Sequence, residues 1–117
     1  MDVEKALQVI TFMMDRSKKA QEKFVQGASQ HTLQKNRIQA FCVALSLVGS
    51  DTTDHFAKED LEKAIAPITS LMSKSEKARG KLAPGTWQHA MLSDNLEALQ
   101  IALSLLTKAV SNEWQSS

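Results

Sequence analysis

The sequence lacks the residues and segments typical of secreted or membrane-inserted proteins. Its 117 residues include one cysteine, Cys42, which excludes an internal disulfide and favours a reducing, intracellular location, expected to be cytoplasmic. No run of about 18 or more apolar residues is present, so neither a membrane-spanning helix nor a membrane partner is expected. Asp2, Glu4 and Lys5 precede the first apolar stretch, where a signal peptide would have a basic start and a longer apolar run.

Signatures of catalysis and of cofactor binding are also missing. The chain has no glycine-rich phosphate-binding loop, no nucleophile motif, no set of four metal ligands and no nucleic-acid-binding module. Neither an HExxH nor an ExxH pair occurs, so the ligand pattern of a carboxylate-bridged di-metal centre is excluded. We therefore expect no enzyme activity, no metal and no cofactor.

An excess of charge of one sign is absent as well. The 14 Lys and Arg residues stand against 13 Asp and Glu, which gives a net charge of +1. Global charge therefore argues for neither nucleic acid nor an anionic membrane as a partner, and any electrostatic function must be local.

What the sequence does contain is one segment written twice. Residues 4–48 align with residues 62–106 at an offset of 58 without a gap, and 18 of the 45 aligned positions are identical. A unit repeated in this way is expected to be one supersecondary element that packs against its twin. We predict repeat 1 at 3–49, a linker at 50–57 and repeat 2 at 58–114. Both repeats belong to a single domain, 1–117, because two separate domains of about 50 residues would each be marginal.

Apolar residues recur at helical spacing in four segments, two in each copy. Gly27 and Gly85 occupy aligned breaks and suit the left-handed position that ends a helix, while Ser29 and Thr86 are available as N-caps. Short connections then predict an all-α, antiparallel up-down-up-down four-helix bundle built from two tandem homologous helical hairpins. Pro67 is expected to kink the third helix or to make its first turn irregular.

Such a bundle would place both turns within the hairpins at one pole, and the linker and chain ends at the other. Residues 15–37 and 73–95, which would build the turn pole, hold ten basic and four acidic residues, a charge of +6, and the remainder carries −5. One interpretation is that these charges offset the helix macrodipoles. The other is an anion site, because the same pole would present the amino ends of the second and fourth helices.

The best-defined polar feature of the repeat is Gln30-His31, which recurs as Gln88-His89 near the start of the second and fourth helices. Such identity can serve the shared hairpin geometry, for example through a histidine that bonds back to the turn. Alternatively, the pseudo-twofold brings both histidines together as a weak metal or anion site. The candidate ligand-binding residues are Gln30, His31, Gln88, His89, Lys19, Lys23, Lys77 and Lys81.

A small non-enzymatic protein that serves as an interaction or regulatory module is the leading functional prediction. The second helix carries a further apolar stripe, Ile38, Val43 and Leu47, and the fourth carries Ile101 and Leu105. This is more apolar width than one side of a small bundle needs, so a protein partner or a homodimer is expected to cover it. The alternative is binding of a phosphate-type anion or of nucleic acid at the basic turn pole.

Single residues allow further expectations. Cys42 lies on an apolar helix face and is expected in the core. Ser17 and Ser75 stand at apolar positions, where a small residue lets helices approach closely. Trp87 is either a cap over the core or an exposed contact at the turn pole, and Trp114 is expected to pack over the open end of the core.

Overall fold

The computed structural model describes residues 1–50 and 56–115, with side chains described for 1–49 and 56–111. The described chain forms four helices and no strand, which confirms the all-helical prediction. They are α1 (Val3–Glu22), α2 (Ser29–Ser50), α3 (Lys58–Gly80) and α4 (Trp87–Gln115). Over the same residues, none of these helices is both long enough and apolar enough to cross a membrane.

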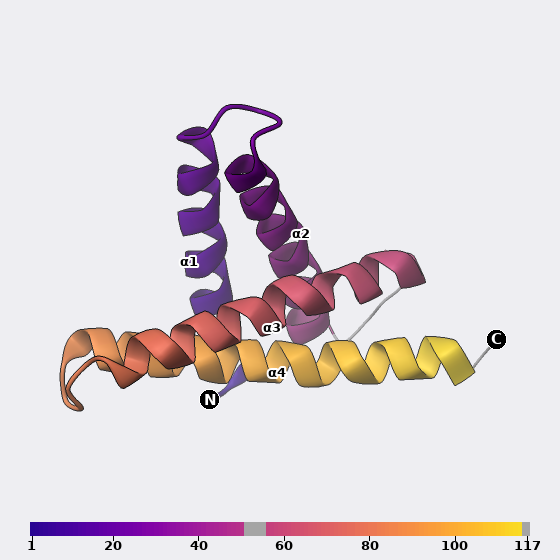
Figure 1. The fold of residues 1–117 in the computed structure, drawn as a ribbon. Coiled ribbons are helices and arrows are strands. Elements are labelled where there is room, and N and C mark those ends of the chain that lie inside the picture. Colours follow the sequence, from indigo (N-terminus) through magenta and orange to yellow (C-terminus); the bar gives the residue numbers. More distant parts are fainter. Residues whose placement is uncertain (51–55, 116–117) are drawn as a thin grey trace.

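The helices pack as two pairs that cross one another (Figure 1). α1 and α2 lie side by side and are joined by a loop at the top of the view, and α3 and α4 lie side by side and are joined at its left. α2 packs against both α3 and α4, and α1 packs against α4, whereas α1 and α3 have no backbone contact in the described ranges. The result is a helical bundle of two crossed hairpins.

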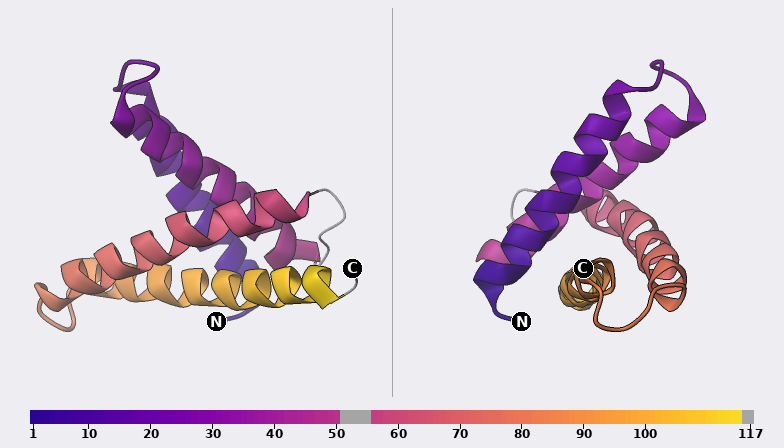
Figure 2. Two further views of the ribbon diagram at one scale, coloured as in Figure 1. Left: turned by 45° about the vertical axis from the view of Figure 1, so that its right-hand side comes forward. Right: turned by 90° about the vertical axis from the view of Figure 1, so that its left-hand side faces the viewer.

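The expectation of one shared turn pole is wrong. The turn at residues 23–28 and the turn at residues 81–86 lie at different extremities, and both views in Figure 2 keep them apart. The physical reason is the further apolar stripe of α2, which was expected to be covered by a partner protein. Val43 and Leu47 are only 3% and 2% exposed, because α2 uses that stripe to pack across the other hairpin.

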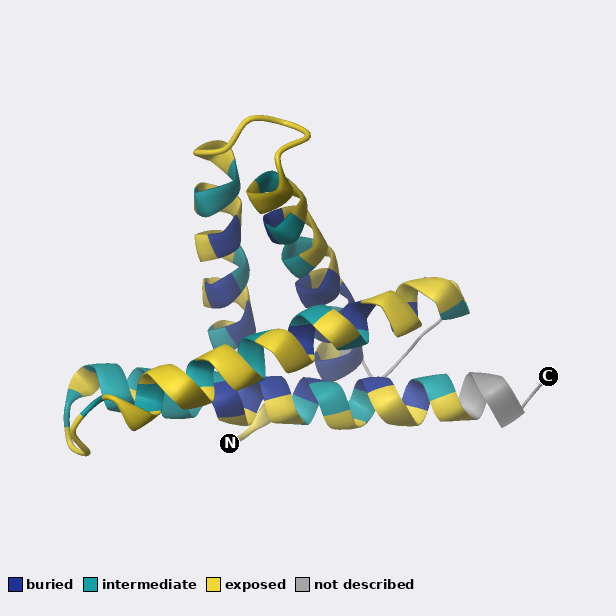
Figure 3. Ribbon diagram, viewed as in Figure 1, coloured by how far each residue is buried: buried dark blue, intermediate teal, exposed yellow. Residues whose placement is uncertain are grey.

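The core lies where the two hairpins cross, as the distribution of buried residues in Figure 3 shows. All four helices contribute to its largest fully buried side chains, which are Ile10, Phe41, Leu61, Ile68, Leu99 and Leu106. Ile10 aligns with Ile68, and Phe41 with Leu99, whereas Leu61 aligns with Val3, which is 56% exposed. Burying each such side chain contributes about 1.5–3 kcal/mol.

Alanines in α2 and α4 allow these two helices to cross closely. Ala40 and Ala44 in α2 are 2% and 1% exposed, and the aligned Ala98 and Ala102 in α4 are both 0% exposed. Each pair is spaced by four residues and therefore lies on one face of its helix. Small side chains on both faces leave room for the two backbones to approach, as a compact crossing requires.

The two hairpins turn in the same way. The Ala28 amide donates to the Val25 carbonyl at 3.0 Å, and the aligned Thr86 amide donates to the Ala83 carbonyl at 3.4 Å. The third residue of each turn is a glycine with a φ of 93°, which is the value that a type II turn requires there. The left-handed glycines were therefore predicted correctly, although each lies several residues beyond its helix rather than directly at the helix end.

The predicted helix caps differ between the copies. Thr86 caps α4, since its Oγ1 accepts a hydrogen bond from the His89 amide at 3.3 Å. Ser29 is instead the first residue of α2, and the helix opens with the Thr32 amide donating to the Ala28 carbonyl at 3.1 Å. The prediction for Ser29 is therefore wrong by one position, because alanine occupies the place that Thr86 has in the second copy.

Pro67 lies inside α3, which continues as one helix from Lys58 to Gly80. The proline is thus well beyond the first turn, and the expected irregular first turn is wrong. The ring removes one amide from the helix ladder, so the carbonyl four residues earlier loses its usual partner. Next to the proline, the Thr69 hydroxyl donates to the carbonyls of Ile65 and Ala66 at 3.1 and 3.0 Å.

The remaining single-residue predictions have mixed outcomes. Cys42 is exposed rather than in the core, because its neighbours Phe41 and Val43 take the inward positions of α2. Ser17 is buried at 8% exposure, as a small residue between close helices should be. Trp87 is 71% exposed and is therefore not a cap over the core, while the side chain of Trp114 lies outside the described residues.

Candidate interaction groove

The predicted ligand-binding residues are divided between the two hairpin tips. We define tip 1 as residues 15–37 and tip 2 as residues 73–95. Tip 1 carries Lys19, Lys23, Gln30 and His31, and tip 2 carries Lys77, Lys81, Gln88 and His89. Because the tips lie at different extremities (Figures 1 and 2), the eight residues form two separate sets of four.

The two histidines do not come together. His31 lies in the first turn of α2 and His89 in the first turn of α4, and these helix ends belong to different tips. The joint two-histidine site is therefore excluded. More generally, no group of three or more His, Cys, Asp and Glu side chains in the described part of the chain is placed to hold a metal ion.

The positive charge of the predicted turn pole is divided as well. Tip 1 has six basic and two acidic residues, a charge of +4, and tip 2 has four basic and two acidic residues, a charge of +2. Each tip also exposes apolar side chains, with Val25 at 80% in tip 1 and Trp87 at 71% in tip 2. An extended basic surface formed by both tips together is therefore absent.

A groove of about 890 Å³ lies between α2 and α3. Its apolar lining is Leu33, Ala40, Val43, Phe56, Ala64 and Pro67. Charged residues at the groove are Lys35 and Arg37 from α2 and Asp60 and Lys63 from α3. An apolar lining with a few charged groups is typical of a site that binds an amphipathic partner.

Arg37 is the most distinctive of these residues. Its side chain is partly buried, and this desolvation lowers the pKa of the guanidinium from its ordinary value. Arginine nevertheless stays charged at physiological pH. Within the described ranges no side chain or carbonyl accepts a hydrogen bond from Arg37 or pairs with it. A carboxylate from a partner would form charge-assisted hydrogen bonds with this guanidinium.

The other charges make the groove basic. Lys35, Arg37 and Lys63 oppose only Asp60, so the lining carries +2. The Asp60 carboxylate is already engaged, since its Oδ2 accepts a hydrogen bond from the Ala57 amide at 3.3 Å at the start of α3. The field in the groove therefore favours an acidic group over a basic one.

The sequence positions that align with the groove lining lie on α1 and α4, and they are here called the α1–α4 face. We define it by Asp2, Lys5, Phe12, Asp94 and Glu97, which align with Asp60, Lys63, Ser70, Asn36 and Gln39 of the groove. The side chains of this face carry three acidic groups and one basic group, and the Met1 ammonium adds a second positive charge, which leaves a net charge of −1. The sign of the charge is thus reversed between the two equivalent places.

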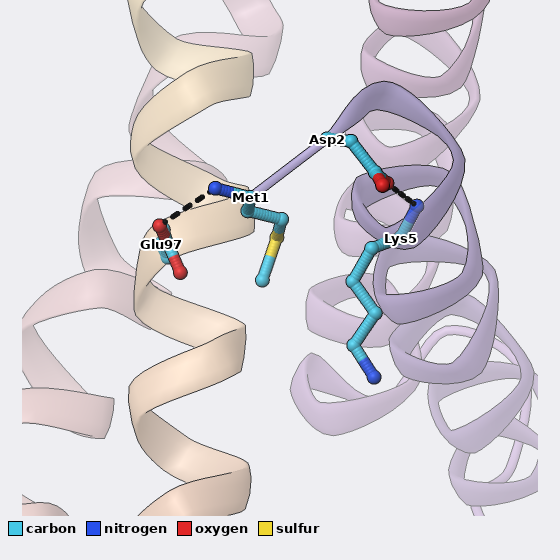
Figure 4. A network of polar contacts seen from close by, with 4 residues as sticks. All are labelled: Met1, Asp2, Lys5 and Glu97. Carbon is cyan, nitrogen blue, oxygen red and sulfur yellow. Dashed lines mark hydrogen bonds and ion pairs between the residues drawn. The ribbon is translucent and has the colours of Figure 1, made fainter.

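Chain contacts at the α1–α4 face are shown in Figure 4. The Met1 ammonium reaches from the start of α1 to the Glu97 carboxylate on α4, with N and Oε1 3.2 Å apart. Asp2 caps α1, since its Oδ1 accepts from the Lys5 amide at 2.8 Å. Both acceptors lie at an exposed surface, where ion pairs are screened by water and contribute little.

The groove and the α1–α4 face also differ in the shape of their surfaces. Ser70 and Ala66 line the groove, and the aligned positions of the α1–α4 face hold the larger side chains of Phe12 and Gln8. Phe12, in the middle of α1, is 60% exposed. The groove is therefore a hollow where the α1–α4 face has a projecting aromatic ring.

Sequence reasoning missed the groove residues because it searched for polar residues that the two copies share. Lys35 aligns with Ser93 and Arg37 with Asn95, so both basic residues stand where the copies differ. A comparison of the charged positions that differ between the copies would have singled them out. Their convergence with Lys63 depends on the crossing of α2 over α3, which the alignment does not contain.

In comparisons with known proteins, the chain matches no family model, no curated protein and no solved structure.

Proposed function

We propose that this protein is a non-enzymatic protein-interaction module, and that its docking site is the groove between α2 and α3. The occupant is a protein segment that combines apolar side chains with at least one carboxylate. Arg37 is the observation that carries the proposal, because its partly buried guanidinium lines an apolar groove and has no acceptor among the described residues. We also propose an intracellular, cytoplasmic setting, since the single cysteine is unpaired.

The scaffold that builds this groove is, we infer, a duplicated antiparallel helical hairpin. Support comes from the 18 identities at an offset of 58, and from turns whose hydrogen bonds join aligned atoms in both copies. Duplication explains why aligned core residues such as Ile10 and Ile68 are completely buried in both copies. Each repeat needs buried apolar residues for the shared core, whereas a binding surface is needed in one part of the molecule only.

Cys42 provides a direct readout of docking, because it is exposed, lines the groove and is the only cysteine. The probe is a synthetic amphipathic helical peptide with glutamates on one face and leucines on the other. We expect it to slow the reaction of the Cys42 thiol with a small thiol reagent, and we expect added salt to weaken this protection. A peptide of the same pattern with lysine for glutamate should give no protection.

Two variants make the experiment specific. Arg37→Gln keeps the size and polarity of the side chain but removes the charge, and should weaken peptide protection about tenfold or more. Lys81→Gln, at tip 2, is the matched control and should leave protection unchanged. Equal protection by acidic and basic peptides, or an effect of Lys81→Gln as large as that of Arg37→Gln, would contradict the proposal. The second outcome would instead favour anion binding at a basic tip.

A further inference from the structure

We propose that the α2–α3 groove accepts the α1–α4 face of a second copy of this chain, so that copies associate head to tail. This inference rests on the proposed docking function of the groove and names its partner. Both the charge and the shape of the surface reverse between the groove and the α1–α4 face.

Charge complementarity is the first observation. The groove has Lys35, Arg37 and Lys63 against Asp60, and the α1–α4 face has three carboxylates against Lys5 and the Met1 ammonium. Of these carboxylates, Glu97 is 52% exposed and pairs, among the described residues, with the Met1 ammonium, an exposed contact that a guanidinium can replace. The positive groove of one copy therefore attracts the negative face of another copy, whereas two grooves or two negative faces repel each other.

Complementary relief is the second observation. Phe12 projects from α1 with 60% of its surface exposed, although the core of its own chain is already formed without it. The groove is a hollow of about 890 Å³ whose apolar lining comes from Leu33, Val43 and Pro67, among others. A phenyl ring that enters such a hollow loses its contact with water and gains apolar contacts, as aromatic anchors do at the centre of protein interfaces.

The two surfaces lie on different faces of the chain, which determines the form of assembly. One copy that fills the groove of another still presents its own empty groove, so the contact does not close a dimer by itself. Association should therefore continue into a series of species, or into a ring if the rotation between copies closes. An isologous homodimer, as the apolar stripe of α2 first suggested, would stop at two copies.

Exchange of the residues at the aligned positions tests this mode of association. Phe12→Ser removes the projecting phenyl ring, and Ser70→Phe fills the groove. Both positions are exposed, so both variants should fold as the native chain does, and circular dichroism would verify this. The native chain should show concentration-dependent association by analytical ultracentrifugation. Each variant alone should weaken it at least tenfold, because each lacks one half of the contact.

A mixture of the two variants gives the sharpest outcome. The Phe12→Ser chain keeps an open groove, and the Ser70→Phe chain keeps the Phe12 ring. The mixture should therefore form a dimer with one copy of each variant and nothing larger. Trp87→Ser is the control, since it removes an equally exposed aromatic residue at tip 2 and should leave association unchanged. Added salt should weaken every association that remains.

Several results would overturn the inference. These are a native chain that stays monomeric up to millimolar concentration, a Phe12→Ser variant that associates like the native chain, and a mixture that forms no dimer. Such a result, together with protection of Cys42 by the acidic peptide, would refute the second copy as partner and leave the docking function in place. Loss of both would refute the docking function itself.

Discussion

The α2–α3 groove and the α1–α4 face are built at aligned positions of the same repeated sequence, yet they are opposites. One is a hollow with a charge of +2, and the other carries −1 and a projecting phenylalanine. Beneath both, equivalent residues such as Ile10 and Ile68 are completely buried. The comparison shows that the shared core fixes the framework, while the outward positions are free to differ and so can give each face its own chemistry.

The largest expected effects test whether the two copies share the core equally. Phe41→Ala and the aligned Leu99→Ala each empty a site that is 1% or 0% exposed. We expect Phe41→Ala to lower the free energy of unfolding by about 3–5 kcal/mol and Leu99→Ala by about 2–5 kcal/mol. Urea unfolding followed by circular dichroism would measure both. A cost below about 1 kcal/mol in either copy would show that this copy does not contribute to a common core.

A smaller effect is expected at Gln34, a buried polar residue whose aligned residue in the other copy is apolar. Gln34 is 9% exposed and its Oε1 has no partner among the described residues, whereas the aligned residue in α4 is Leu92. Gln34→Leu should therefore raise the free energy of unfolding by about 1–3 kcal/mol, because it removes an unsatisfied buried carbonyl. The reciprocal Leu92→Gln should be destabilising. The midpoint of thermal unfolding would report both changes, and a destabilised Gln34→Leu variant would show that the amide has a partner in solution.

The two turns should respond alike to the loss of glycine. Gly27 and Gly85 share a φ of 93°, and a methyl group added at either would meet no atom within 4 Å. The cost of Gly27→Ala and of Gly85→Ala is therefore purely a backbone cost of about 1 kcal/mol each. Parallel urea unfolding curves would compare them. A difference of more than about 1 kcal/mol between the two variants would contradict the equivalence of the turns.

The smallest expected effects concern the helix caps. Thr86 caps α4 through its hydroxyl, whereas Ala28 occupies the aligned position before α2. Thr86→Ala should lower the free energy of unfolding by about 1 kcal/mol, and Ala28→Thr should raise it by a similar amount. Hydrogen exchange of the first amides in each helix would locate the change. Unchanged protection of the His89 amide in Thr86→Ala would show that the cap does not form.

Much of the fold could be predicted from the sequence because local signals are strong. The helical spacing of apolar residues predicted four helices, and the aligned glycines predicted the left-handed turn positions that Gly27 and Gly85 adopt. The cap at Ser29 was misplaced because serine is a good N-cap by type, and the side chain that actually precedes the helix is an alanine. Cys42 was placed inside because the apolar stripe of α2 is wide, and periodicity alone does not define its edges.

The relative placement of the hairpins could not be predicted in the same way. Val43 and Leu47 form a stripe that must be covered, but periodicity is equally satisfied by a second molecule, an aligned hairpin or a crossed one. The crossing selects the third solution and separates the tips, so His31 and His89 no longer meet. The crossing also places Arg37 and Lys63 in the lining of the same groove, which no local sequence pattern predicts.

The separation of the tips is the most direct test of this account. Gln26→Cys in tip 1 and Ala83→Cys in tip 2, introduced into Cys42→Ser, would carry spin labels for a distance measurement by double electron–electron resonance. Crossed hairpins predict a single distance well above about 20 Å. A distance at or below about 20 Å would contradict the account, because neighbouring turns of an aligned bundle follow helix axes only about 8–10 Å apart.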